Sequence, residues 1–244
     1  EDMHRRMAKE FGRIEADYKV KYNLNGSAKF LSDYGQKRKH LTEGRIFDLF
    51  ENFGYIIPQG SVMSSLGNTY KIASLSNCIV VPEMHDSYGG VFYTDQQLAQ
   101  LFKRRCGVGV DISNLRPSGS HVSNAAGTTS GAVSFMKRFS HTTREVAQNG
   151  RRGALMLSMD IAHPDVEDFT TIKQDLTQVT GANISLRLSD EFMSAVEKNT
   201  EYTHKWPIDS EDPKFTKTVN ARELWETIIK CAHNTAEPGL IYWD

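Results

Sequence analysis

The chain has 244 residues, of which 39% are apolar and 24% are charged, and its formal net charge is −1. This is enough chain for one or two globular domains with a sizeable core. Apolar runs are only a handful of residues long, which excludes a membrane-spanning helix, and the charged first residues do not resemble a signal peptide. Three widely spaced cysteines form neither a metal-ligand pattern nor a disulfide framework. We therefore expect a cytoplasmic protein in a reducing setting.

The first 60 residues predict a small helical subdomain. Apolar side chains recur at helical spacing from Met3 to Tyr18 and again from Ile46 to Phe53, where Gly54 is the expected stop. The segment 22–41 between these helices is polar and predicts a loop. We place the domain boundary between residues 60 and 61.

Residues 61–244 predict a parallel α/β domain. Strands are expected at 77–81, 107–112, 154–159, 183–188 and 239–243, with a helix between each pair. Thr94 and Gln97 form a capping box for a helix through Phe102, and Ser189 and Asn220 cap two later helices. A parallel sheet needs cover on both faces, and the chain stops on a strand. We therefore expect this chain to be covered by something else or to be a piece of a larger fold.

Positive charge is concentrated between Lys103 and Gly153. This stretch holds nine Lys and Arg residues and only two acidic residues, Asp111 and Glu145. A solvated basic face is one interpretation. The other is a site for an anion, because several of these arginines stand near glycines, which allow close approach, and arginine binds phosphate through two parallel hydrogen bonds. Few aromatic residues accompany them, so a small phosphorylated ligand fits better than a nucleic-acid strand.

Cys78 stands at the start of a predicted strand, just before a turn rich in polar residues and glycine. Packing is the default interpretation, since free cysteine is among the most buried residue types. A nucleophilic thiol is an alternative, which needs a nearby histidine base, and His85 is the only candidate close in sequence. For Cys106 and Cys231 we expect packing.

Several motifs in series resemble the catalytic (large) subunit of ribonucleotide reductase. They are SLSNC, KRRCGVGVDISNLRPSGS, GAVSFMKRFSHTTREVAQNGRRGALML, HPDVEDF, VTGANISLRLSDEFM and EPGLIYWD, and the match runs in order from about residue 45 to the end. The resemblance implies a ten-stranded α/β barrel made of two five-stranded parallel halves. Residues 1–60 would be the N-terminal helical segment, and 61–244 the first half of the barrel with its effector-binding loops. A stand-alone nucleotide-binding or dimerisation module without catalysis is the alternative.

The family reduces ribonucleotides at the 2′ carbon by thiol and radical chemistry. By this resemblance Cys78 is the first member of the redox cysteine pair, which must face the sugar from a rigid strand. The resemblance also implies a radical-bearing cysteine, a second redox cysteine and C-terminal shuttle cysteines, none of which lies in this sequence. We therefore expect the chain to act only with a complementary C-terminal half.

Three further positions resemble substrate-binding residues of the family. Asn77 is a substrate-contacting position. Gly107 matches a glycine whose main chain approaches the ribose, where only glycine leaves room. Ser61 is the candidate for holding the substrate phosphate, with Ser64 and Ser65 as rivals because the spacing is ambiguous.

The family also binds a deoxynucleoside triphosphate or ATP at the dimer edge, and this effector selects the base to be reduced. Asp86, Ser87 and Tyr88 stand where the family holds the sugar and base of the effector. Arg116 and Lys103 stand where it holds the phosphates. By the resemblance, the basic excess between Lys103 and Gly153 belongs to this site.

Two loops resemble the specificity loops of the family. The loop 117–131 resembles the first, and 173–183 resembles the second, which carries the signal to the substrate base. The polar make-up of the second loop suits a mobile segment. Its singled-out residues are Lys173, Asp175, Gly181 and Asn183.

The resemblance also implies cofactors and partners, but no metal bound by this chain. The sequence His163-Pro164-Asp165 predicts a helix start, since no second histidine follows at ligand spacing. The radical generator would be a metal-containing small subunit or adenosylcobalamin, and the reductant a thioredoxin- or glutaredoxin-type protein. The implied partners are the complementary half, a second catalytic subunit in a homodimer and the small subunit, with no nucleic acid and no membrane. Whether the substrate is a diphosphate or a triphosphate stays open.

Overall fold

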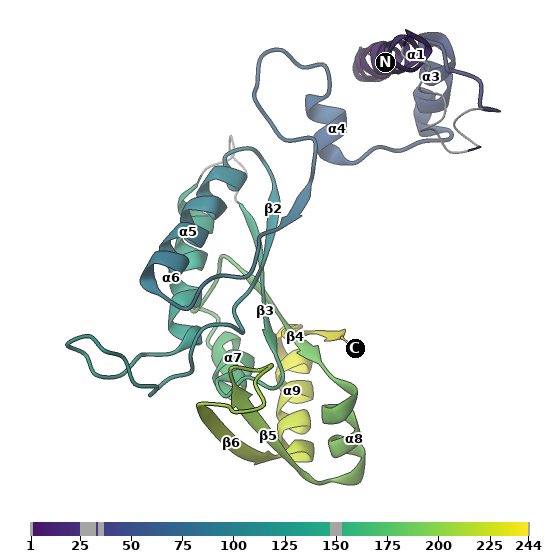
Figure 1. Ribbon diagram of the computed structural model, residues 1–244. Coiled ribbons are helices and arrows are strands. Elements are labelled where there is room, and N and C mark those ends of the chain that lie inside the picture. The colour runs from purple at the N-terminus through teal and green to yellow at the C-terminus, as the bar shows by residue number, and fades with distance from the viewer. Residues whose placement is uncertain (1, 25–32, 34–36, 147–152, 244) are drawn as a thin grey trace. The chain divides into compact units, whose positions relative to one another are not determined.

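The computed structural model describes residues 2–24, 33, 37–146 and 153–243 (Figure 1). The chain divides into two compact units, Glu1–Asn77 and Cys78–Asp244. The division falls after Asn77 and not after residue 60, because the segment that follows residue 60 packs on the first helix. None of the helices described is both long enough and apolar enough to cross a membrane.

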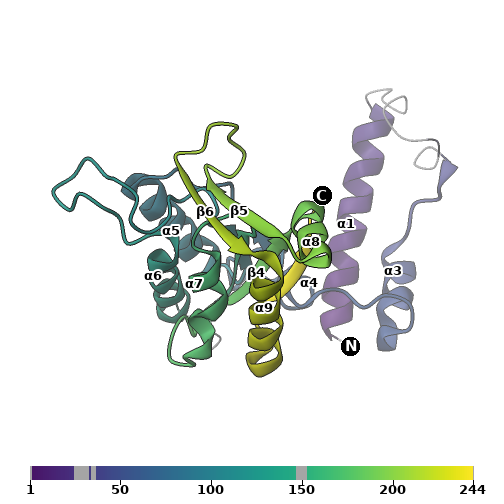
Figure 2. The same cartoon turned by 90° about the horizontal axis from the view of Figure 1, so that it is seen from below.

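The first unit is helical, as the sequence predicted. It contains α1 (Asp2–Leu24), α3 (Glu43–Phe50), the 3-10 turn η2 (Glu51–Phe53) and α4 (Gly60–Ser65). Helices α1 and α3 lie side by side (Figure 2). Their small core contains Met7, Ala8, Ile46, Phe50 and Leu66. The backbone oxygens of Met63 and Leu66 accept hydrogen bonds from the Arg6 guanidinium, which ties the end of α4 to α1.

The second unit is built on a five-stranded parallel sheet, which confirms the predicted parallel α/β arrangement. The strands lie in the order β1 (Cys78–Val80), β2 (Gly107–Asp111), β3 (Ala154–Asp160), β4 (Asn183–Leu188) and β7 (Gly239–Tyr242). The connecting helices are α5 (Tyr88–Phe102), α6 (Ala132–Glu145), α7 (Val166–Thr171) with the 3-10 turn η3 (Ile172–Gln174), α8 (Asp190–Lys198) and α9 (Ala221–Thr235). In the part of the chain that is described the sheet is open, with β1 and β7 at its edges.

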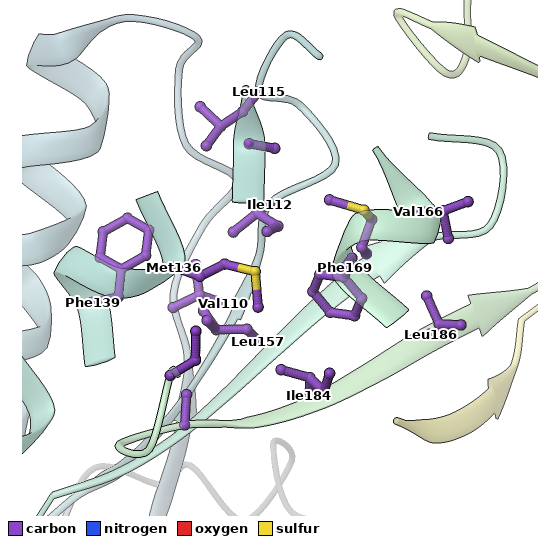
Figure 3. Close-up of a cluster of buried hydrophobic side chains, with 14 of the residues drawn as sticks. Val110, Ile112, Leu115, Met136, Phe139, Leu157, Val166, Phe169, Ile184 and Leu186 are labelled. Atoms are coloured by element: carbon purple, nitrogen blue, oxygen red, sulfur yellow. The ribbon is translucent and has the colours of Figure 1, made fainter. Parts of the chain in front are cut away.

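The helices of this unit bury one face of the sheet. Alternate strand residues such as Val110, Leu157 and Ile184 point into the main core, where Figure 3 shows them facing Phe139 of α6 and Phe169 of α7. Successive strand residues point to opposite faces. The intervening residues therefore share the second face of the sheet, which the helices of this unit leave uncovered.

A two-stranded antiparallel hairpin was not predicted from the sequence. It pairs β5 (Glu201–Trp206) with β6 (Phe215–Asn220), and Figure 2 shows the two strands running alongside each other. Both strands are rich in charged and hydroxyl residues, so neither forms an apolar run. Burial along β5 nevertheless alternates with the period of two expected of a strand, since Tyr202 and His204 are buried while Thr203 between them is exposed.

The helix expected to begin at Thr94 begins earlier, at Tyr88. Ser87 is its N-cap and accepts a hydrogen bond from the Gly90 amide at 3.0 Å. Thr94 and Asp95 lie inside the helix and are buried against α6, where Asp95 Oδ1 accepts a hydrogen bond from the Thr142 hydroxyl at 2.5 Å. The capping-box prediction was therefore wrong. The predicted caps Ser189 and Asn220 are confirmed, since each accepts a hydrogen bond from an amide of its own helix.

Burial of His204 makes the second unit sensitive to acid. The imidazole is fully buried, its Nδ1 lies 2.9 Å from the Ile161 carbonyl oxygen, and burial lowers its pKa from 6.5 to about 4. The unfolded chain therefore takes up a proton first as the pH falls from 6.5 towards 4. Stability is present above that window and decreases across it, by about 3 kcal/mol for a shift of this size.

We expect the His204→Asn variant to lose less stability than the wild type between pH 6.5 and 4. Asparagine keeps a donor for the Ile161 oxygen but does not titrate. Urea unfolding followed by circular dichroism at several pH values measures the slope. His141→Gln, at an exposed position of α6, is the control. Equal slopes in the His204 variant and the wild type would contradict the assignment.

Candidate functional site

Cys78 is a free, exposed cysteine at the start of the edge strand β1. Its exposure argues against the packing interpretation. The Cα partner of Cys78 across the sheet is Gly107, whose own partner on β3 is Ala154. These three residues share the uncovered face, where Val80, the next β1 residue on that face, is 80% exposed. The thiol therefore faces open space beside a glycine main chain.

The structure does not pair Cys78 with a histidine base. His85 lies beyond the far end of β1, and its Nδ1 is 3.0 Å from the Ser87 hydroxyl. Among the described residues no hydrogen bond joins it to Cys78. Cys106 and Cys231 are buried, as predicted, and burial raises the pKa of the Cys231 thiol. Cys78 is thus the thiol of this sequence that is open to chemistry.

A charged cluster further along the uncovered face was missed by the sequence analysis. The Arg187 guanidinium lies 3.2 Å from Asp111 Oδ2 and 3.3 Å from Asp160 Oδ2, and the Ser158 hydroxyl donates to Asp111 Oδ2 at 2.7 Å. Burial raises the pKa of Asp160, while a hydrogen bond from the Ala162 amide and the charge of Arg187 oppose the shift. These polar residues fall at alternate strand positions, which is the signal that could have revealed them.

The predicted substrate residues Ser61 and Asn77 are in contact within the first unit. The Ser61 amide donates to Asn77 Oδ1 at 3.0 Å, and the Ser61 hydroxyl donates to the same oxygen. The side-chain Nδ2 of Asn77 donates to Gln59 Oε1. Gln59 was not predicted from the sequence. The rival serines Ser64 and Ser65 contact each other, with their hydroxyls 3.1 Å apart. Ser61 is therefore the serine that the structure joins to Asn77.

A cavity of about 450 Å³ brings together most of the predicted effector residues. Asp86, Ser87 and Tyr88 lie at the start of α5, and Arg116 lies at the start of the loop 117–131, which extends away from the sheet in Figure 1. The other lining residues supply apolar walls and loop hydroxyls: Val91, Leu115, Val122, Ser123, Asn124, Ala126, Thr128, Thr129, Ser130 and Phe135. The loop is held in shape by a bridge between His121 and Thr128.

Arg116 is the charged centre of this cavity. Its Nε lies 2.7 Å from Asp86 Oδ2, and its backbone amide donates to Asp86 Oδ1 at 3.1 Å. A second guanidinium nitrogen donates to the His121 carbonyl at 3.0 Å. The guanidinium also lies 5.9 Å from the centre of the Trp206 ring. Arg116 is thereby oriented by three separate segments of the chain.

Lys103 does not lie in this cavity. It is the C-cap of α5, at the opposite end of this 15-residue helix from the N-cap Ser87, and the rise of the helix places the two caps about 24 Å apart. Of the basic residues described between 103 and 146, only Arg116 lines the cavity. Arg138, for example, pairs with Asp95 at 2.7 Å. The charge segregation seen in the sequence therefore does not correspond to one basic pocket in the described part of the chain.

The segment 173–183 is anchored at both ends. Lys173 Nζ lies 2.5 Å from Glu237 Oε2 and donates to the Ala182 carbonyl at 2.5 Å. The Gly181 amide donates to the Ser140 hydroxyl at 2.9 Å, and a Cβ at Gly181 would lie 2.4 Å from the Ser140 carbonyl. The segment therefore meets α6 at a point where only glycine fits.

The middle of this segment is exposed. Leu176 is 75% exposed, and Asp175 accepts hydrogen bonds from the Thr177 amide and hydroxyl, which lower the pKa of its carboxyl. Asn183 begins β4 and, with Gly181, lines a smaller cavity of about 240 Å³ beside Arg144. The four predicted residues thus occupy one segment between α7 and β4. The structure describes no cluster of metal-ligating side chains in the residues it covers.

Comparison with known proteins identifies the family. The profile of the ribonucleotide reductase barrel domain matches residues 76–244. The chain belongs to the ribonucleotide reductase barrel family. It is 31% identical, over 98% of its length, to the vitamin B12-dependent ribonucleoside-diphosphate reductase of Thermoplasma acidophilum. A protein of the same name from Mycobacterium tuberculosis is 33% identical over 82% of the chain, and the ribonucleoside-diphosphate reductase large chain of Neurospora crassa is 28% identical over 70%.

The chain spans only part of the length of these reductases. It matches 30% of the Thermoplasma protein, 28% of the Mycobacterium protein and 21% of the Neurospora protein. The family match begins at residue 76, two residues before the Cys78 strand. It therefore covers the whole sheet, the cavity around Arg116 and both loops.

The exposure of the three cysteines predicts their reactivity. We expect Cys78 to react with a disulfide reagent such as dithionitrobenzoate much faster than Cys106 or Cys231 in the native protein, because accessible thiols exchange and buried ones do not. Absorbance should report one fast thiol in native buffer and three in denaturant. Cys78→Ser should remove the fast phase, and Cys231→Ser should keep it. A fast phase that survives in Cys78→Ser would refute this placement.

Proposed function

We propose that the chain is part of a ribonucleotide reductase catalytic subunit and supplies one redox thiol, part of the substrate site and an effector site. The observation that carries the proposal is the exposed Cys78 thiol on a rigid strand, beside the Gly107 main chain, on the uncovered face of the sheet. In the overall reaction a ribonucleotide and two thiols give a deoxyribonucleotide, a disulfide and water. The ribose 2′ carbon is reduced, and the two thiols are oxidised. Cys78 is one of those two thiols.

The second thiol must come from outside these 244 residues. The other two cysteines are buried, Cys106 where the chain enters β2 and Cys231 on α9. Neither shares the uncovered face with Cys78. We propose that a complementary segment covers this face with five more parallel strands, completes a ten-stranded barrel, and brings both the second redox cysteine and the radical cysteine opposite Cys78.

The names of the relatives bear on the cofactor and the substrate. Two of them are called vitamin B12-dependent and ribonucleoside-diphosphate reductases. We therefore favour adenosylcobalamin over a metal-containing small subunit as the radical generator, and a diphosphate substrate. No residue of this chain is assigned to hold the cobalamin. A thioredoxin- or glutaredoxin-type protein would reduce the disulfide after each turnover.

We propose that the cavity around Arg116 binds a deoxynucleoside triphosphate or ATP as an allosteric effector. A volume of about 450 Å³ suits a ligand of this size. Arg116 would contact the phosphates, Asp86 and Ser87 the sugar hydroxyl, and Tyr88 the base. Asp86 and Arg116 bond to each other in the structure, so an effector would bind to a pair that is already oriented. Lys103 has no part in this cavity. A homodimer that shares the effector is part of the same proposal.

Cys78→Ser should abolish multiple turnover with dithiol reductants in the complemented enzyme. Serine keeps nearly the same volume and can hydrogen-bond, but it cannot form a disulfide. Turnover is measured as deoxynucleotide formed per enzyme, with circular dichroism and nucleotide binding as checks on folding. Cys231→Ser is the matched control and should retain activity.

Two outcomes separate the alternatives. A serine variant that turns over at the wild-type rate would remove Cys78 from the chemistry. A wild-type chain that binds nucleotide but is never active with any complementary segment would favour the stand-alone nucleotide-binding module, because the effector cavity is formed within this chain while the second thiol is not.

Arg116→Ala or Asp86→Ala should each weaken binding of dTTP or a related effector by about 1–3 kcal/mol, the usual cost of losing one partner of a charge-assisted hydrogen bond. Affinity should also fall as salt rises, because the contacts are ionic. Calorimetry measures both effects. Arg222→Ala is the control for the loss of an arginine. Arg222 lies on α9 and donates to the Glu197 carbonyl, so this variant should bind the effector like the wild type. Unchanged affinity in folded Arg116 and Asp86 variants would exclude these residues from the site.

A further inference from the structure

A single buried carboxylate joins the two ends of the loop that forms the effector cavity. Asp165 is 6% exposed. It accepts hydrogen bonds from the Ser118 amide at 3.0 and 3.1 Å, and from the Ala132 amide at 3.0 Å. Ser118 lies at the beginning of the loop 117–131, and Ala132 is the first residue of α6, directly after it. Both ends of the loop therefore bond to the same side chain.

Asp165 serves a helix other than its own. It occupies the N-cap position of α7, where an aspartate normally accepts a hydrogen bond from its own helix, yet it makes no such side-chain bond. The N-cap of α6 is Gly131, which has no side chain to offer. Asp165 instead binds the first amide of α6 across a sequence distance of 33 residues. The unpaired amides at the start of that helix favour a carboxylate.

Gly131 leaves the space in which this carboxylate sits. Its φ is 85°, and a Cβ there would lie 2.5 Å from Asp165 Oδ2 and 2.6 Å from the Ser118 amide. Gly119, in the same loop, has a similar φ of 80°, but a Cβ there would meet nothing within 4 Å. The two glycines thus share a backbone conformation and differ in their contact with the carboxylate.

His163 bonds to the backbone of Asp165 and to the segment that precedes the loop. The imidazole is fully buried, and its Nε2 donates to the Leu115 carbonyl at 2.7 Å while its Nδ1 accepts from the Asp165 amide at 3.0 Å. This pair of bonds requires the neutral ring with its proton on Nε2, and burial lowers the pKa of His163. Leu115 itself lines the effector cavity. His163 and Asp165 together hold the entry and the exit of the loop.

The clamped elements also lead to the second loop. Helix α6, whose first amide Asp165 binds, carries Ser140 and Arg144, and these bond to Gly181 and Thr180 at 2.9 and 2.6 Å. Helix α7, which follows Asp165, runs directly into η3 and the segment 173–183. The motif His163-Pro164-Asp165 is therefore connected to both loops, 117–131 and 173–183, through the helices α6 and α7.

We propose that Asp165, held by His163, is a positioning residue that sets the shape of the loop 117–131 before a nucleotide binds. The proposal rests on the effector site proposed above. It gives a role to His163-Pro164-Asp165, which the sequence analysis interpreted only as a helix start. Without the clamp the loop must be ordered by the nucleotide itself, and the cost of ordering is subtracted from affinity.

The test is nucleotide binding to Asp165→Asn in the full chain, measured by calorimetry with the four deoxynucleoside triphosphates and ATP. An asparagine amide keeps the shape but replaces one acceptor oxygen with a donor. We expect affinity to fall about tenfold, as for a lost charge-assisted hydrogen bond. Asp168→Asn removes the same charge from an exposed position on α7 and should bind like the wild type. Asp165→Glu, which keeps the charge on a longer arm, should recover part of the affinity.

Gly131→Ala is the second variant and tests the clamp from the other side. It should weaken binding as Asp165→Asn does, while Gly119→Ala should have a much smaller effect despite the same backbone strain. Hydrogen exchange at the Ser118 and Ala132 amides separates positioning from general destabilisation, since these amides should exchange faster while those of β3 and β4 do not.

The outcomes are distinguishable. A wild-type chain that binds none of the nucleotides would overturn the proposed effector site. A wild-type chain that binds, with an equal affinity in folded Asp165→Asn or Gly131→Ala, would overturn the clamp alone. Faster exchange throughout the sheet in these variants would show a role in stability and not in positioning.

Discussion

The second unit depends on one constraint, which is that a parallel sheet with all its helices on one side must sort its residues strictly by face. Val110, Leu157 and Ile184 fill the core against α6 and α7. The side chains next to them in each strand therefore point to the other face of the sheet. A slip of one residue in β1 would turn Cys78 towards the helices. The position of the thiol is therefore a consequence of how the core packs.

The two ends of the uncovered face differ in the kind of side chain they carry. Small residues lie together at one end, where Cys78, Gly107 and Ala154 are in register. Charged groups lie together at the other, where Arg187 is placed between Asp111 and Asp160. Such a face is costly to bury unless its charges are paired, and here they are. Under the proposed function, the substrate sugar would bind at the small end, beside Cys78 and Gly107.

The loop 117–131, which lines the cavity, is attached to this frame through one half-buried ion pair and one buried carboxylate. Arg116 is oriented by Asp86, and the loop ends are joined by Asp165. These bonds do not involve the basic residues of α6, of which Arg138, for example, is paired with Asp95. Of the basic residues described between 103 and 146, only Arg116 lines the cavity, so in the proposed effector site it is this one oriented arginine, and not the total positive charge of the region, that would meet a nucleotide.

The sequence alone determined the features that depend on local order. Helical spacing located α1 and α3, short apolar runs located the five strands, and Ser189 and Asn220 marked their helices, because periodicity and capping act within a few residues. The run of motifs identified the family, because each motif is a short stretch of sequence. Only the tertiary structure decided that Lys103 lies a helix length away from Ser87, that Tyr202 and His204 build a hairpin, and that Asp165 caps a helix other than its own. The separation of Lys103 from Ser87 follows from where α5 begins. The hairpin and the cap depend on which segments meet in space, and packing across the core sets those contacts while neighbouring residues in the chain do not.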